Sequence, residues 1–273
     1  MADFFDNTMF SLYRDYIYEQ SGISFSDSNR SILESRLKER LRQHQIETPR
    51  EYFDMLKKDE GETRSFLDSI TTNLTRFFRN QAHYDAFINY VIPDLVEYKR
   101  ANGLEKKLVF WSAGCSTGEE PYTNAMVLKE HLPPDYDFTI IASDLSLKSL
   151  MKAQMGTYTA NMVRNVPEKY LNKYFKASGD SYTVIDDLKK HIRFDYHNLK
   201  YDSGQRNVDC VFCRNVLIYF DEAAQKNVVD QFWNVMADHA YLFIGHSESL
   251  FGMETSFKFI KTDWACLYGK MLK

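Results

Sequence analysis

The sequence predicts an α/β protein in which a doubly wound domain with a mixed seven-stranded sheet follows a small all-helical domain. Residues 1–70 carry apolar side chains at helical spacing and no strand-like run. From residue 101 onward, short apolar runs alternate with amphipathic helices. We therefore expect a helical domain over 1–70, a linker and connecting helix over 71–100, and an α/β domain over 101–273.

Composition excludes several classes of protein. The net charge of −4 argues against a general nucleic-acid binder, and four cysteines in 273 residues do not indicate a disulfide framework. No window approaches the roughly 20 apolar residues of a membrane span, and the N-terminus lacks a signal-peptide pattern. We expect a cytoplasmic monomer that binds no nucleic acid and does not insert into membranes.

Four short helices are expected in the first domain, with Gly61 separating the third from the fourth. The second helix carries an apolar stripe through Leu33, Leu37 and Leu41, and its other faces are rich in arginine and lysine. This basic surface is either the solvated face of an amphipathic helix or a docking site for an acidic helix.

Residues 71–80, TTNLTRFFRN, contain poor helix formers, with two phenylalanines between Arg76 and Arg79. The segment is either a capped inter-domain junction with a hydrophobic plug or a loop that closes over a ligand. A long helix, broken by Pro93, is expected to follow over 81–100.

The stretch 108–121, LVFWSAGCSTGEEP, predicts a buried strand, a turn of small residues and a helix that begins at Glu119. Gly114 and Gly118 are four residues apart, and the third glycine of the dinucleotide fingerprint is missing. Acids at the helix start would repel a pyrophosphate, so a cationic or zwitterionic ligand fits better.

Asp144 ends a second expected strand over 138–143. A carboxylate at this position can accept hydrogen bonds from both ribose hydroxyls of an adenosine, and it can also cap the helix that follows. The remaining expectations are a small antiparallel excursion within 156–192, strands at 191–196, 208–213 and 240–244, a helix at 221–237, and a terminal hairpin over 257–268.

Two motifs suggest other chemistries. Cys210 and Cys213 have metal-site spacing, but side chains three apart on a strand point to opposite faces of the sheet. The run 245–249, GHSES, resembles the nucleophile elbow of an esterase with Ser247 as nucleophile. The closing glycine is missing, however, and no histidine follows His246, so an esterase is a poor alternative.

Six blocks together resemble the chemotaxis receptor methyltransferases (CheR family), which methylate receptor glutamates using S-adenosylmethionine. The blocks are TTNLTRFFR (71–79), AGCSTGEEPY (113–122), ASDLS (142–146), HNL (197–199), FCRNVLIYFD (212–221) and GHSES (245–249). The resemblance covers nearly the whole chain and implies a Rossmann-like class I methyltransferase fold.

The resemblance also implies residue roles. Glu119 would meet the cationic part of the methionyl moiety, and Asp144 would hold the ribose. Tyr219 and Arg79 would face the acceptor as the catalytic pair. The cofactor site would be formed by Asn73, Thr75, Arg79, Gly114, Glu119, Asp144, Asn198, Leu199, Arg214 and Asn215.

The expected substrate is a glutamate on an acidic cytoplasmic helix of a chemoreceptor, and Arg36 and Arg40 on the basic helix are candidate docking residues. A glutamate with a pKa near 4.3 is already ionised at neutral pH, so the reaction needs no general base. The connection 175–184 lacks the glycine-rich insertion of tether-binding members of the family. We therefore expect an enzyme that does not depend on a receptor tether. A regulator that binds S-adenosylmethionine without turnover is the alternative.

Overall fold

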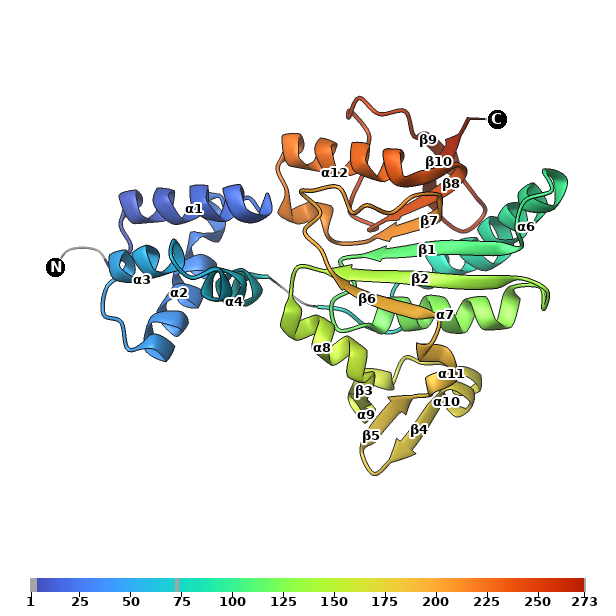
Figure 1. Cartoon of the computed structure of the whole chain (residues 1–273), viewed down its shortest axis with the longest axis horizontal. Coiled ribbons are helices and arrows are strands. Elements are labelled where there is room, and N and C mark those ends of the chain that lie inside the picture. The colour runs from blue at the N-terminus through green and yellow to red at the C-terminus, as the bar shows by residue number, and fades with distance from the viewer. Residues whose placement is uncertain (1–3, 72–73, 273) are drawn as a thin grey trace.

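A computed structural model describes residues 4–71 and 74–272. The first part of the chain forms a helical domain that lies beyond the ends toward which strands β1 and β2 point (Figure 1). Its core contains the fully buried side chains of Tyr13, Leu37, Tyr52 and Phe66. The helices are α1 (Asn7–Ser21), the 3₁₀ turn η1 (Asp27–Asn29), α2 (Arg30–His44), α3 (Pro49–Leu56) and α4 (Glu60–Ile70).

Two local expectations about the helices are wrong. Gly61 lies inside the first turn of α4, because the Asp59 side chain accepts the Glu62 N–H and starts the helix before the glycine. Pro93 does not break the connecting helix. It occupies the first turn of α6, directly after a π-helical turn, so the helix continues past it. The segments are α5 (Gln81–Ala86), η2 (Phe87–Val91) and α6 (Ile92–Ala101).

The main sheet has the strand order β6-β2-β1-β7-β8-β10-β9. Strands β6, β2, β1, β7 and β8 run parallel, and β10 pairs antiparallel with both β8 and β9. The expected seven-stranded mixed sheet is therefore confirmed. The strands are β1 (Lys107–Ala113), β2 (Asp137–Asp144), β6 (Ile192–Tyr196), β7 (Val208–Cys213), β8 (Met236–Ile244), β9 (Lys258–Lys261) and β10 (Cys266–Met271).

Separate hydrophobic layers cover the two faces of this sheet. Phe110 packs in the layer that includes α7 (Glu119–His131), whereas its neighbour Trp111 packs in the layer that includes α12 (Glu222–Val235). Cys210 and Cys213 likewise belong to opposite layers, as the strand periodicity predicts. Among the described residues, no group of acidic, histidine and cysteine side chains is arranged to hold a metal ion.

A three-stranded antiparallel sheet of order β3-β5-β4 projects from the α/β domain and confirms the expected excursion (Figure 1). Its strands are β3 (Thr157–Thr159), β4 (Phe175–Ser178) and β5 (Ser181–Val184). The helices around it are α8 (Leu147–Met155), α9 (Ala160–Val163), α10 (Glu168–Tyr174) and α11 (Asp186–Lys189). Across residues 4–71 and 74–272, none of the helices combines the length and the apolar character needed to cross a membrane.

Candidate functional site

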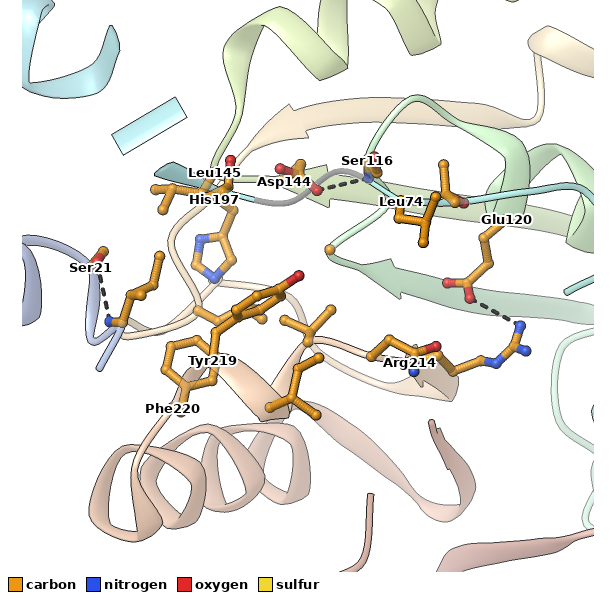
Figure 2. A pocket seen from close by; sticks show the side chains of 18 of the residues that line it. Ser21, Leu74, Ser116, Glu120, Asp144, Leu145, His197, Arg214, Tyr219 and Phe220 are labelled. Atoms are coloured by element: carbon orange, nitrogen blue, oxygen red, sulfur yellow. Dashed lines mark hydrogen bonds and ion pairs between the residues drawn. The ribbon is translucent and has the colours of Figure 1, made fainter. Parts of the chain in front are cut away.

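A cavity of about 290 Å³ lies at the carboxyl ends of β1, β2 and β7, where ligands bind in open α/β sheets. Asp144 and Ser116 border one side, and Tyr219 and Phe220 border the other (Figure 2). Glu120 lies at one end of the cavity (Figure 2). The structure brings together the following residues that the sequence predicts for the site: Thr75, Arg79, Gly114, Asp144, Asn198, Leu199, Arg214, Asn215 and Tyr219.

Asp144 organises the loop between β1 and α7. One of its carboxylate oxygens accepts the Ser116 N–H at 2.7 Å, and the other accepts the Ser146 N–H at 2.8 Å. The cap of α8 is Ser146, whose hydroxyl accepts the Ser149 N–H at 3.0 Å. Burial raises the pKa of Asp144, and the two backbone donors oppose that shift.

The two glycines of this loop are required by its geometry. Gly114 has φ +83°, and a Cβ on it would lie 2.4 Å from a methyl of Val216. Gly118 has φ +97°, and a Cβ there would lie 2.8 Å from the Tyr158 hydroxyl oxygen. Positive φ and close neighbours both exclude larger residues. Gly114 therefore lets the loop pass close to the segment after β7, and Gly118 lets it pass close to Tyr158.

The acid that lines the cavity is Glu120, whereas Glu119 is not among the lining residues that the structure describes. Glu120 accepts hydrogen bonds from the Ser112 hydroxyl at 2.7 Å and from Nη1 of Arg214 at 3.2 Å. Glu119 is 1% exposed and accepts a hydrogen bond from the Thr117 hydroxyl at 2.7 Å. Burial raises the pKa of both carboxyls, and the Arg214 guanidinium opposes the shift at Glu120.

A hydrogen bond joins the linker, residues 71–80, to the end of β7. The Arg214 guanidinium, which lies over the Tyr84 ring at 5.6 Å, donates a hydrogen bond to the carbonyl of Arg79. Arg79 in turn donates to the Leu74 carbonyl at 2.9 Å. Partial burial and the nearby guanidinium of Arg214 lower the pKa of Arg79. Asn73, which the sequence also predicts for this site, lies outside the described residues.

Phe77 and Phe78 anchor the linker on the α/β domain. Phe77 is fully buried, with its ring edge-on to Tyr158 at 4.9 Å, and Phe78 lies 5.0 Å from the Tyr170 ring. The structure thus contains the hydrophobic plug that the sequence offers as one alternative, and other residues of the same segment border the cavity. The phenylalanines fill the core, while Thr75 and Arg79 line the cavity.

The helical domain contributes a wall that sequence reasoning missed. Ser21 and Ile23 line the cavity, and Ile23 pairs with Phe220 as an antiparallel bridge. The Ser24 N–H donates to the Tyr219 carbonyl at 2.8 Å. No local sequence signal marks these residues, because their role depends on how the two domains pack.

Comparison with known proteins gives matches along nearly the whole chain. Residues 8–71 match the family described as "CheR methyltransferase, all-alpha domain", and residues 73–266 match "CheR methyltransferase, SAM binding domain". The chain belongs to the CheR methyltransferase family. The cofactor of this CheR methyltransferase is accordingly S-adenosylmethionine.

Curated relatives include chemotaxis protein methyltransferases from several bacteria. Chemotaxis protein methyltransferase 2 of Vibrio cholerae is 36% identical and covers 89% of this chain and 86% of its own length. The protein from Borreliella burgdorferi is also 36% identical, covering 86% of both chains. The Escherichia coli protein is 33% identical and covers 88% of this chain and 84% of its own.

The cavity of this CheR methyltransferase fits the chemistry of its cofactor. Figure 2 shows apolar and aromatic side chains, among them Leu145, His197 and Phe220, toward the helical domain, with Asp144 between them and Glu120. Adenine, a ribose and an amino acid with a cationic sulfur succeed one another along S-adenosylmethionine. An apolar region, a carboxylate and a second carboxylate suit these three parts in that order.

The two candidate docking residues on α2 differ in their surroundings. Arg40 is 15% exposed and donates to Glu62, which is 6% exposed and also accepts a hydrogen bond from the Tyr52 hydroxyl. Arg36 is 46% exposed and lies 3.7 Å from Glu39 of the same helix. Of the pair, Arg36 presents its charge to solvent, whereas Arg40 belongs to the core network of the helical domain.

Proposed function

We propose that this CheR methyltransferase transfers a methyl group from S-adenosylmethionine to glutamate side-chain carboxylates of chemoreceptor cytoplasmic helices. The products are glutamate methyl esters and S-adenosylhomocysteine. The observation that carries the proposal is the order of groups along the cavity, from an apolar region through Asp144 to Glu120. The names of the relatives, which are chemotaxis protein methyltransferases, support a chemosensory substrate.

In this proposal, Asp144 accepts hydrogen bonds from the ribose hydroxyls. Glu120 faces the ammonium group of the methionyl part, a role that the family resemblance gave to Glu119. Leu199 and Asn198 border the adenine together with Leu145 and His197. Thr75 and Arg79 close the site from the linker. Apart from Glu119, whose role passes to Glu120, the proposal keeps the cofactor residues that the sequence predicts.

The acceptor carboxylate is placed beside Arg79 and Tyr219, which both line the cavity. S-adenosylmethionine supplies a methyl group that is activated by a positively charged sulfur. The acceptor glutamate is ionised at neutral pH, so these residues orient it and exchange no proton with it. The half-buried Val216 side chain also lines the cavity, and with the bound acceptor it would limit access of water to the reacting groups. The protein then accelerates methyl transfer mainly by orienting the acceptor carboxylate and by excluding water.

Substrate recognition is assigned to the basic face of α2, with Arg36 as its exposed docking residue. The receptor segments expected as substrates are acidic helices, so an exposed guanidinium would attract them and increase the rate of encounter. The hairpin between β4 and β5 turns through Gly179 and Asp180 alone. This short turn supports an enzyme that acts without a receptor tether.

Transfer of labelled methyl from S-adenosylmethionine to purified receptor cytoplasmic fragments tests the proposal. We expect incorporation that is released by mild base, because carboxyl methyl esters hydrolyse readily while methylated nitrogen does not. Fragments whose glutamates are replaced by glutamine or alanine serve as controls. Binding of S-adenosylhomocysteine without any transfer would instead support the sensing regulator. Ser247 is exposed, and its replacement by alanine should leave transfer unchanged, which an esterase would not allow.

A further inference from the structure

The GHSES run after β8 contains a carboxylate that is bound to the wall of the cavity. Oε2 of Glu248 accepts the backbone N–H of Asn215 at 2.8 Å, and Oε1 accepts the N–H of Ile218 at 3.2 Å. The N–H of Gly245 also donates to Oε2. One side chain thus receives three backbone donors, two of which belong to the segment that follows β7.

The backbone around this carboxylate is shaped to receive it. Asn215 adopts φ +61°, which is uncommon for a residue other than glycine. A Cβ on Gly245 would lie 2.5 Å from Oε2 of Glu248 and 2.8 Å from the Asn215 nitrogen. The absence of a side chain at Gly245 therefore leaves the space through which the carboxylate reaches Asn215.

The segment held by Glu248 forms one wall of the cavity. Residues 214–219 contribute to it the side chains of Arg214, Asn215, Val216, Ile218 and Tyr219. Glu248 itself is not among the described residues that line the cavity. Hydrogen bonds from backbone N–H groups to a carboxylate are stronger than those between neutral groups, so they can fix a strained turn.

We propose that Glu248 is a positioning residue of this methyltransferase, which holds residues 214–219 in the shape that binds the cofactor and presents Tyr219 to the acceptor. The cofactor part rests on the family membership of the chain. The acceptor part rests on the proposed function, so the two are measured separately below. The run 245–249, GHSES, resembles a nucleophile elbow. Under this proposal its function is instead to hold residues 214–219 in place through Glu248.

The test compares Glu248→Gln with two controls on the same connection, Ser247→Ala and Glu254→Gln, whose side chains are exposed. Glutamine keeps the shape but removes the charge and turns an NH₂ group toward backbone donors. We expect the dissociation constant for S-adenosylhomocysteine to rise about tenfold or more, since hydrogen bonds to a charged acceptor are lost. The turnover number at saturating cofactor should fall by a similar factor, with both controls within about twofold of the wild type.

A purely structural role would lower the melting temperature of Glu248→Gln and leave its affinity and turnover unchanged below that temperature, and this result would overturn the proposal. Calorimetric stoichiometry near one verifies that the measured protein is folded. If the variant does not fold, amide hydrogen exchange of the wild-type protein tests the proposal instead. The amides of Asn215 and Ile218 should be protected without ligand, and exchange at the rate of an open loop would overturn the proposal. Because S-adenosylhomocysteine binding needs no acceptor, a wrong substrate assignment would leave this readout intact.

Discussion

Arg214 and Glu120 form a buried ion pair, with 3.2 Å between Nη1 and Oε2, although 94 residues separate them in the chain. Their side chains are 3% and 13% exposed. Since Arg214 also donates to the Arg79 carbonyl, the pair connects the end of β7, the start of α7 and the linker. The charge of Glu120 is thus held in place by Arg214 at the edge of the cofactor cavity.

Replacing Glu120 should weaken cofactor binding far more than replacing Glu119. Glu120→Gln removes the charge that is proposed to face the ammonium group of the cofactor, whereas Glu119 contacts Thr117 outside the cavity lining. Loss of one member of a buried charge pair costs about 2–5 kcal/mol, so we expect an affinity loss of about 30-fold or more for Glu120→Gln. Titration calorimetry with S-adenosylhomocysteine measures it, with Glu119→Gln as the matched control. A larger loss for Glu119→Gln would return the acidic role to Glu119.

The sequence predicted the cavity well because parallel strands all end at one edge of a sheet. Asp144 and Arg214 each follow a buried apolar run, so the predicted topology already places both residues at the same cavity. Glu119 and Glu120 are adjacent on a helix and point about 100° apart, and no pattern within the helix says which one faces the loop. The position of Ser21 in the cavity wall depends on how the two domains pack, and the periodicity of a local sequence does not predict that packing.

Removing the hydroxyl of Tyr219 should slow methyl transfer and leave cofactor affinity nearly unchanged. The ring of Tyr219 lies across the cavity from Asp144, and the residue is proposed to orient the acceptor carboxylate (Figure 2). We expect Tyr219→Phe to lower the turnover number by about tenfold to a hundredfold, the range of a lost hydrogen bond to a charged group. Steady-state kinetics with receptor fragments and calorimetry with S-adenosylhomocysteine separate the two effects. Loss of cofactor binding with turnover intact would contradict the assignment.

Charge reversal at Arg36 and at Arg40 should have different consequences. Arg36→Glu changes an exposed guanidinium, so we expect a higher KM for receptor fragments and unchanged cofactor affinity. Stability should fall by only about 0.2–0.5 kcal/mol, the cost of placing a second acid beside Glu39 on an exposed helix face. Arg40→Glu places an acid against the buried Glu62, which also lies 3.0 Å from His44. Breaking a buried pair costs roughly 3–5 kcal/mol, so this variant should unfold at much lower urea concentration. Equal stability of the two variants would show that the Arg40 network is dispensable, and an unchanged KM for Arg36→Glu would remove the docking role.

The buried imidazole of His83 should make the protein less stable in mild acid. Burial, with a contribution from the nearby Arg214 charge, lowers the pKa of His83 from 6.5 to about 3. Below pH 6.5 the unfolded chain binds a proton that the folded state does not. The free energy of unfolding should therefore fall by up to about 1.4 kcal/mol per pH unit between pH 6.5 and about 3, and this contribution is constant above pH 6.5.

Urea unfolding of the wild type and of His83→Asn between pH 4 and 8 measures this contribution. The variant lacks the titrating group, so its stability should be lower at pH 8 but should fall less steeply in acid. The difference between the two pH profiles isolates the contribution of the His83 imidazole. Parallel pH profiles for the wild type and His83→Asn would show that another group causes the acid sensitivity.

Cofactor binding and docking of the helical domain should be coupled through Asn198. Its side-chain NH₂ donates to the Gln20 carbonyl at 2.8 Å, while its carbonyl oxygen accepts the Lys200 N–H at 3.0 Å. Asn198 also lines the cavity. Asn198→Asp has the same shape but cannot donate at neutral pH, so a carboxylate would face the carbonyl of Gln20. We expect about a tenfold loss of affinity for S-adenosylhomocysteine and faster amide exchange over residues 19–24.

The matched control is Asn227→Asp, since the exposed Asn227 side chain donates to the Lys200 carbonyl at 3.2 Å without lining the cavity. This control should leave both affinity and exchange over 19–24 unchanged. In the wild type, S-adenosylhomocysteine should slow exchange over the same residues, because Ser21 and Ile23 form part of the cavity wall. If Asn198→Asp lost affinity while exchange over 19–24 stayed at the wild-type rate, Asn198 would act on the ligand alone. Docking of the helical domain would then not be coupled to cofactor binding.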